Sequence, residues 1–141
     1  MPPVRPMDRA TIEKITSCYD AFNAQGWVID ADFFLPNVEW RNAPELPGAT
    51  LHCGLEAVNA DLARQGEAWE SRYAEPVELH AACDQVVVIL KYRVRGKASG
   101  VPIETELVHV WTVENGRIRR IEAFLDRNVA LAAANLGAAG D

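Results

Sequence analysis

Residues 108–122 read VHVWTVENGRIRRIE, two runs rich in β-branched residues that flank the dipeptide Asn115-Gly116. This dipeptide tolerates the positive φ angles of a type I′ turn, so the stretch predicts a tight β-hairpin. A two-residue loop fixes the pairing beyond it, and His109 then faces Glu122 on one side of the sheet. The other pairs in this register are Glu114 with Arg117, Trp111 with Arg120, and Leu107 with Phe124.

The preceding hairpin is predicted from its charges. Basic residues in the run 91–97 alternate with other residues, so they share one face of a strand. One register forms two cross-strand ion pairs, Lys91 with Glu106 and Arg93 with Glu104. Exposed ion pairs are worth only about 0–1 kcal/mol each, so they indicate register rather than stability. The same register places two further pairs side by side, Val88 with His109 and Tyr92 with Thr105.

Helices are predicted mainly at the start of the chain and strands over the rest. From Asp8, a residue that caps helices, apolar residues recur at helical spacing up to Gly26, a natural helix end. Further helices fit residues 27–35 and 55–69, and an Ala-rich closing helix or tail fits 127–136. The predicted strands are residues 38–42, 73–83, 85–97, 101–113 and 117–126, with a Pro- and Gly-rich loop at 44–48.

This order of elements predicts one α+β domain over residues 8–136, with three N-terminal helices packed on the concave face of a curved, mainly antiparallel sheet. Residues 1–7 are Pro-rich and are expected to be loose. A domain of this size buries roughly 68% of the surface of its unfolded chain, so it needs neither a disulfide nor a metal to fold.

The opposite face of the predicted sheet is also apolar. Its residues are Val87, Ile89, Val108, Val110, Ile121, Ala123 and Leu125. Helices sufficient for one face would leave this surface in water, and monomeric soluble proteins rarely expose so large an apolar patch. We therefore expect a homodimer formed through this face of the sheet.

Composition limits the partners of the protein. The formal net charge of −6 argues against a nucleic-acid partner and against an anionic membrane. No apolar run approaches a membrane span, and the first residues carry no apolar leader segment. The three cysteines, Cys18, Cys53 and Cys83, stand in no paired motif, which indicates buried free thiols in a reducing cytoplasm. A cytoplasmic location is expected.

Short motifs follow one another along residues 8–136. They are Tyr19-Asp-Ala-Phe22-Asn23-Ala-Gln-Gly26-Trp27, Val38-Glu39-Trp40-Arg41-Asn42, Gly54-Leu-Glu56-Ala57-Val58, His109-Val-Trp111-Thr with Glu114-Asn-Gly116-Arg-Ile118, and Leu125-Asp126-Arg127. Together they resemble the SnoaL-like branch of the NTF2-like superfamily of ketosteroid isomerases, polyketide cyclases and limonene-epoxide hydrolases. The resemblance implies a cone with a pocket at its open end, and usually a dimer. The superfamily also holds dehydratases, binding proteins and transport factors, so the fold does not determine the function.

The resemblance allows the catalytic positions of these enzymes to be compared with this chain. Tyr19 falls where ketosteroid isomerases carry a helix-one Tyr, whereas Trp40 and His109 fall at the positions of the Asp base and the Asp donor. Without the base carboxylate, steroid isomerisation by that mechanism is not expected. Trp40 and Asn42 resemble the Tyr-x-Asn pair that holds a water in the epoxide hydrolases. Of the Asp–Arg–Asp set of the epoxide hydrolases, this chain offers a candidate for only one acid, Glu122, so epoxide hydrolysis is a lesser alternative.

His109 and Glu122 are the predicted catalytic pair. Glu122 would accept the Nδ1–H of the imidazole and leave Nε2 to take a proton from a substrate carbon or from water. Other interpretations are a buried polar pair that only satisfies itself, a Glu–Arg pair at the rim, and Glu122 alone as a base whose pKa an apolar pocket raises. Asp126 either reaches the pocket mouth or caps the following helix, and the cap is favoured.

The residues predicted to line an apolar cavity around this pair are Tyr19, Trp40, Asn42, Tyr92, Trp111, Phe124 and Asp126. We expect the cone to bind a hydrophobic small molecule, with cofactor-independent acid–base catalysis such as cyclisation, isomerisation or dehydration as one possibility. The alternative is a non-catalytic ligand-binding or dimeric interaction module, which a cone plugged by its own aromatic rings would favour. Neither a cofactor nor a metal is expected, because the histidines are scattered and no Cys-x-x-Cys occurs.

Overall fold

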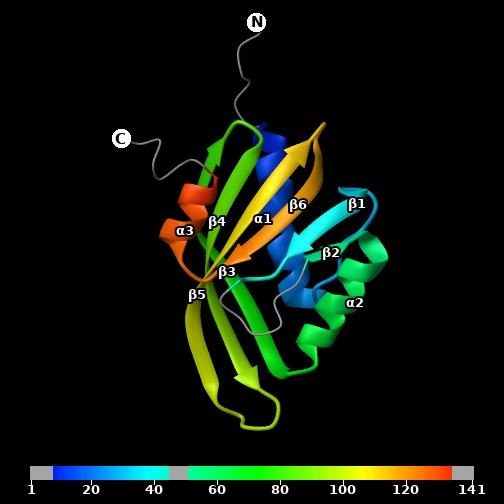
Figure 1. The fold of residues 1–141 in the computed structure, drawn as a ribbon. Helices are drawn as coiled ribbons and strands as arrows, with labels where there is room; N and C mark the ends of the chain where they lie inside the picture. The colour runs from blue at the N-terminus through cyan, green and yellow to red at the C-terminus, as the bar shows by residue number, and fades with distance from the viewer. Residues whose placement is uncertain (1–7, 45–50, 135–141) are drawn as a thin grey trace, which may run out of the picture.

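Six strands form one curved sheet in the order β2-β1-β6-β5-β4-β3 (Figure 1). The computed structural model describes residues 8–44 and 51–134. Its strands are β1 (Phe34–Arg41), β2 (Leu51–Cys53), β3 (Trp69–Ala82), β4 (Gln85–Gly96), β5 (Pro102–Glu114) and β6 (Arg117–Phe124), and its helices are α1 (Arg9–Gln25), α2 (Leu55–Gly66) and α3 (Arg127–Ala133). Neighbouring strands are antiparallel except β1 and β6, which run parallel.

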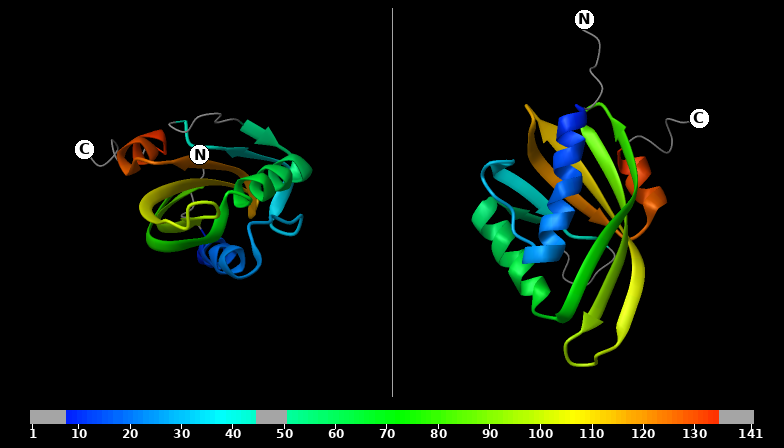
Figure 2. Two further views of the ribbon diagram at one scale, coloured as in Figure 1. Left: turned by 90° about the horizontal axis from the view of Figure 1, so that it is seen from below. Right: turned by 180° about the vertical axis from the view of Figure 1, so that it is seen from behind.

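Helices cover the sheet on both sides (Figure 2). On the concave side, α1 contacts β3, and α2 contacts the strands β1, β2 and β3. On the outer side, α3 contacts β4, β5 and β6. The prediction of an α+β domain with a curved, mainly antiparallel sheet is confirmed. Two of the three helices are N-terminal, as expected, but the third closes the chain on the opposite face. None of the helices in the described part of the chain is long and apolar enough to span a membrane.

The first helix has the predicted bounds. Asp8 caps it, because its side chain accepts a hydrogen bond from the amide of Ala10 at 3.1 Å. Gly26 ends it with a φ of 99°, a conformation that glycine adopts without strain. The buried side chains of α1 recur at helical spacing and form part of the concave core: Ile15, Tyr19 and Phe22.

The predicted helix at residues 27–35 is wrong. The Asp30 carboxylate accepts hydrogen bonds from the amides of Asp32 and Phe33, which forms a turn in place of a helix. The chain then enters β1 at Phe34, which lies beside Ile118 of β6. Three residues of the segment after the Pro-rich loop form the unpredicted strand β2, and α2 ends at Gly66, before the predicted bound of 69. Three predicted features lie outside the described residues: the loose segment at 1–7, part of the loop at 45–48, and the end of the closing helix at 135–136.

The β4–β5 hairpin has the predicted register. Lys91 pairs with Glu106 and Arg93 with Glu104, and the guanidinium of Arg93 donates to the Glu104 carboxylate at 3.1 Å. His109 lies beside Val88, as expected. The alternating charges therefore indicated the correct pairing of these two strands.

The β5–β6 hairpin follows the prediction at its turn and departs from it at Arg119. Asn115 and Gly116 have φ angles of 52° and 78°, and Glu114 pairs with Arg117. A bulge then leaves Arg119 unpaired, so every later pair is shifted by one residue. The pairs beyond the bulge are Thr112 with Arg120, Trp111 with Ile121, Val110 with Glu122, His109 with Ala123, and Val108 with Phe124.

This shift moves residues of β6 between the two faces of the sheet. Ile121 and Ala123, which were predicted on the outer face, lie on the concave face with Trp111 and His109. On the outer face, α3 buries an apolar cluster of Val87, Ile89, Val108, Val110, Phe124, Ala130 and Ala134. The central part of that face is therefore covered within one chain, and the prediction that it lies uncovered is wrong.

Candidate functional site

His109 occupies the centre of the concave face, with only 1% of its surface exposed. It lies on β5 between Val88 of β4 and Ala123 of β6. Three aromatic rings surround the imidazole, with centroids 5.6 to 5.8 Å from its own: those of Tyr19, Trp27 and Trp40. An ionisable side chain thus lies within an apolar, aromatic interior, as the sequence predicted.

Tyr19 connects His109 to Trp111 through two hydrogen bonds. The indole Nε1–H of Trp111 can only donate, and it donates to the Tyr19 hydroxyl oxygen at 2.8 Å. The hydroxyl hydrogen of Tyr19 is then directed at Nδ1 of His109, 2.7 Å away. Nδ1 is therefore the acceptor, and the proton of the neutral imidazole is on Nε2. No described residue hydrogen-bonds to this Nε2.

The ionisation of this group of residues is suppressed. Burial and, to a smaller extent, the positive charge of Arg72 together lower the pKa of His109 from 6.5 to about 3. Burial also raises the pKa of Tyr19 well above its usual value, although the hydrogen bond from Trp111 opposes this shift. At neutral pH the imidazole is thus uncharged and presents an Nε2–H donor.

Arg72 belongs to this site, although the sequence analysis did not single it out. It lies on β3, half-buried, with its guanidinium 4.5 Å from the centroid of the Trp27 ring. Its positive charge also acts on the phenol of Tyr92, where it moderates the raised pKa that burial gives that group. Residues two apart on a strand share one face, so the apolar Ala74 was the sequence feature that could have placed Arg72 on the concave face. Ala74 is fully buried there.

The structure separates Glu122 from His109. Because of the bulge at Arg119, Glu122 lies on the outer face, where it forms ion pairs with Arg41 at 3.8 Å and Arg120 at 3.9 Å. The predicted His109–Glu122 pairing is therefore wrong. Phe124 is also on the outer face, buried beneath α3, so it does not line the interior around His109.

The other predicted residues divide into two groups. Tyr19, Trp40, Tyr92 and Trp111 lie on the concave side with His109. Asp126 caps α3 by accepting a hydrogen bond from the amide of Asn128 at 2.8 Å, so the favoured interpretation of this residue is confirmed.

Asn42 belongs to a separate polar cluster, which the sequence analysis missed. Its centre is Asp61 of α2, a carboxylate only 4% exposed. Asn42 and Gln65 donate to one oxygen of Asp61, and Arg64 and His52 contact the other. Each carboxylate oxygen has partners, so the cluster fixes the corner between β1, β2 and α2. The i, i+4 spacing of Asp61 and Gln65 on one helix was its detectable feature.

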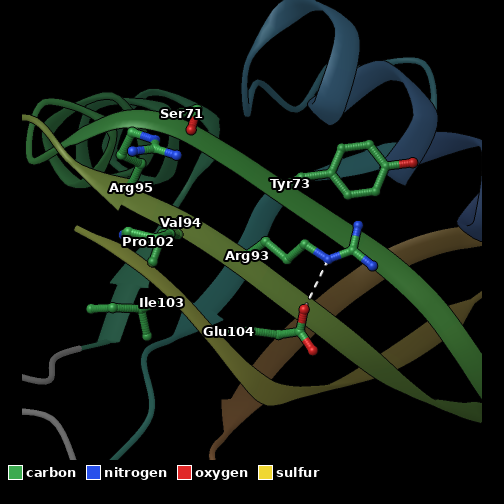
Figure 3. A pocket seen from close by; sticks show the side chains of 8 residues that line it. All are labelled: Ser71, Tyr73, Arg93, Val94, Arg95, Pro102, Ile103 and Glu104. Atoms are coloured by element: carbon green, nitrogen blue, oxygen red, sulfur yellow. Dashed lines mark hydrogen bonds and ion pairs between the residues drawn. The ribbon is translucent and has the colours of Figure 1, made fainter. Parts of the chain in front are cut away.

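The surface hollows lined by the described residues include two that lie away from His109. One of about 390 Å³ lies along β3, β4 and β5, where Arg93 forms an ion pair with Glu104 beside Tyr73 and Arg95 (Figure 3). Another of about 620 Å³ lies at the start of α2, lined by Pro36, Cys53, Gly54, Leu55, Glu56, Ala57 and Ala60. Neither is lined by a residue that contacts His109.

Within residues 8–44 and 51–134, no group of three or more His, Cys, Asp or Glu side chains could hold a metal ion. All three cysteines are free thiols. The expectation that they are buried is wrong for Cys53 and Cys83, which are exposed, while Cys18 is half-buried.

Comparison with known proteins agrees with this architecture. A search among curated proteins gives no match. Solved structures share the fold. TerC co-crystallised with polyporic acid is 23% identical over 89% of this chain and 96% of its own, with a TM-score of 0.70. An NTF2-like protein of unknown function from Burkholderia pseudomallei K96243 is 21% identical over 89% of this chain and 97% of its own, and a proposed SnoaL-like polyketide cyclase from Jannaschia sp. CCS1 is 17% identical over 94% of this chain and 96% of its own; both have a TM-score of 0.75. Identities this low establish a common fold and no common activity. The family model of the SnoaL-like domain matches residues 15–121, and the chain therefore belongs to the SnoaL-like family.

Proposed function

We propose that the concave interior binds a hydrophobic, aromatic small molecule through an oxygen of that molecule, with His109 as the central hydrogen-bond donor. The observation that carries this proposal is the Nε2–H of His109, a residue 1% exposed among aromatic rings, which forms no hydrogen bond with a described residue. A second donor nearby, the Nε1–H of Trp27, is fully buried and has no partner among the described residues. Buried polar groups are nearly always hydrogen-bonded, so the unpartnered indole beside His109 supports binding of a ligand that brings the acceptor.

The chemistry that this donor supports is polarisation of a carbonyl group. A neutral imidazole with a pKa of about 3 is too weak a base to remove a proton efficiently at neutral pH. As a hydrogen-bond donor, however, it stabilises the negative charge that develops on a carbonyl oxygen during enolisation, while water or hydroxide from the solvent takes the proton from the α-carbon. Enolisation is the common step of the cyclisation, isomerisation and dehydration reactions that we propose for this site. Tyr19 and Trp111 fix the tautomer that makes His109 a donor.

A non-catalytic binding or interaction module is the second candidate. It is favoured by the filled interior, because Trp40 and Trp111 are only 3% and 0% exposed and His109 is equally enclosed. A ligand that reaches Nε2 must therefore displace aromatic side chains. Epoxide hydrolysis has less support, because the Asn42 amide that would hold a water already bonds to Asp61 and Gln65.

The test uses a neutral aromatic ketone, 2-acetylnaphthalene, in D₂O. We expect the protein to bind it, measured by quenching of tryptophan fluorescence, and to accelerate deuterium exchange at its methyl group, measured by NMR. His109→Phe should abolish the acceleration. Glu122→Gln, which changes a carboxylate on the outer face, is the matched control and should retain it. Binding without exchange would favour the non-catalytic module, and absence of binding would contradict the proposal.

A further inference from the structure

Arg72 differs from the other arginines in what it contacts. Every other arginine among residues 8–44 and 51–134 binds a carboxylate or a backbone carbonyl: Arg9, Arg41, Arg64, Arg93, Arg95, Arg117, Arg119, Arg120 and Arg127. Arg72 has no ion pair with any described residue. Its contacts are the face of the Trp27 ring and the Tyr92 side chain. A half-buried guanidinium without a counter-ion is costly unless something else supplies the negative charge.

The groups around Arg72 are also rich in donors. Trp27 brings a buried Nε1–H without a partner, and His109 brings its Nε2–H. The Trp27 ring contacts both Arg72 and His109, because its centroid lies 4.5 Å from the guanidinium carbon of Arg72 and 5.8 Å from the imidazole centroid of His109. Arginine, indole and this imidazole tautomer supply donors and one positive charge, and no described carboxylate joins them. Only a group with several acceptor oxygens and a negative charge would satisfy this set.

We propose that the site binds an aromatic carboxylic acid or a comparable organic acid, with the Arg72 guanidinium as the anchor for its anionic group. This inference rests on the proposed function, since it assumes that the same interior accepts an aromatic ligand. The planar guanidinium matches the two oxygens of a carboxylate and binds them through parallel N–H···O bonds. Trp27 and Tyr92, whose ring centroids are 6.3 Å apart, provide aromatic surface next to that anchor.

The experiment compares two probes of almost the same shape, 2-naphthoate and the neutral ketone 2-acetylnaphthalene. The wild-type protein should bind naphthoate more tightly than the ketone, with an affinity that falls as salt is added. Arg72→Gln should weaken naphthoate binding by roughly 10- to 100-fold, as expected for loss of a hydrogen bond to a charged group, and leave ketone binding almost unchanged. Arg72→Lys keeps the charge without the planar fork and should lie between the two.

Arg95→Gln is the matched control. Arg95 is exposed on the neighbouring strand, faces the outer side and has a backbone carbonyl as its partner, so its loss removes the same charge away from the interior. Naphthoate binding should not change in this variant. If Arg72→Gln and Arg95→Gln weaken naphthoate binding equally, or if neither weakens it, Arg72 is not the anchor, even when the ketone still binds. If neither probe binds the wild-type protein, the proposed function itself fails. Near-ultraviolet circular dichroism checks that each variant is folded, and Arg72→Lys decides the question where Arg72→Gln does not fold.

Discussion

The residue that most changes the chemistry of the interior is Tyr19. A carboxylate beside Nδ1 of His109 would accept a hydrogen bond from Nδ1–H and leave the unprotonated Nε2 as a base. The Tyr19 hydroxyl, which already accepts from Trp111, instead donates to Nδ1 and leaves the proton on Nε2. The expected general base is therefore a hydrogen-bond donor in the structure. The group beside Nδ1 thus decides whether Nε2 acts as a base or as a hydrogen-bond donor.

Burial of His109 should make the stability of the protein depend on pH. Its pKa is about 3 in the folded protein and 6.5 when unperturbed, so between these values the unfolded chain binds a proton that the folded chain does not. The stabilising effect is therefore complete above pH 6.5 and is lost as the pH falls toward 3. We expect the free energy of unfolding to fall by about 1.4 kcal/mol for each pH unit in this window. Urea denaturation at pH values from 7.5 to 5 measures the slope.

One variant separates His109 from the other titrating groups. His109→Gln removes the titrating imidazole and should flatten the slope between pH 6.5 and 5. An equal slope in the wild-type protein and His109→Gln would show that His109 does not titrate as its burial requires.

At the scale of elements, the turn of the β5–β6 hairpin could be predicted and the register beyond it could not. Asn115-Gly116 dictates a turn by its backbone preferences alone. The bulge at Arg119 depends on which residues the core accepts. Ile118 and Ile121 are both fully buried on the concave face, although residues three apart on a regular strand point to opposite faces. This odd spacing of two isoleucines was the sequence feature that indicated the bulge.

The segment between α1 and β1 could not be predicted for a different reason. Its apolar residues fit a helix as well as a strand, and contacts distant in sequence determine the outcome. The Asn59 side chain hydrogen-bonds to both the amide and the carbonyl of Ile29, at 2.8 and 2.9 Å. Arg117 of β6 then donates to the carbonyl of Phe34 at 3.2 Å. For the site, Tyr19 and Trp40 beside His109 were predicted, whereas Trp27 was not. Arg72 was not predicted either, because nothing in its local sequence indicates its missing partner.

The bulge predicts the effect of deleting one residue. Removing Arg119, the unpaired residue, would leave a regular hairpin that keeps the observed pairs, with Ile121 opposite Trp111 and Ala123 opposite His109. Removing Ile121 instead would bring Arg120 opposite Trp111, so an unpaired charge would enter the apolar interior in place of an isoleucine, at a cost of about 3–5 kcal/mol or more. We expect the Arg119 deletion to retain cooperative thermal unfolding, measured by circular dichroism, and the Ile121 deletion to abolish it. Equal stability of the two deletions would contradict the role of the bulge.

At the scale of the whole molecule, the outer face of the sheet has two different regions. Beneath α3 it is apolar and already buried within the chain. Beyond α3, on β3, β4 and β5, it is exposed and carries charges of both signs around Tyr73, which is 46% exposed. The Arg93 guanidinium lies 5.9 Å from the Tyr73 ring and forms ion pairs with Glu75 and Glu104. A surface that mixes both charges around an aromatic ring can complement a second copy of itself across a two-fold axis.

The homodimer therefore remains a prediction, with its interface moved from the buried centre of the outer face to the region around Tyr73. Light scattering at micromolar concentration should give about twice the chain mass of 15.6 kDa. Tyr73→Glu would place a third carboxylate beside Glu75 and Glu104, so like-charge repulsion across the two-fold axis should produce a monomer. Val28→Glu is the matched control: Val28 is an apolar residue 65% exposed in the segment between α1 and β1, so this variant should remain dimeric. A wild-type monomer would refute the dimer, whereas a dimeric Tyr73→Glu would refute this interface and require α3 or another surface to form it.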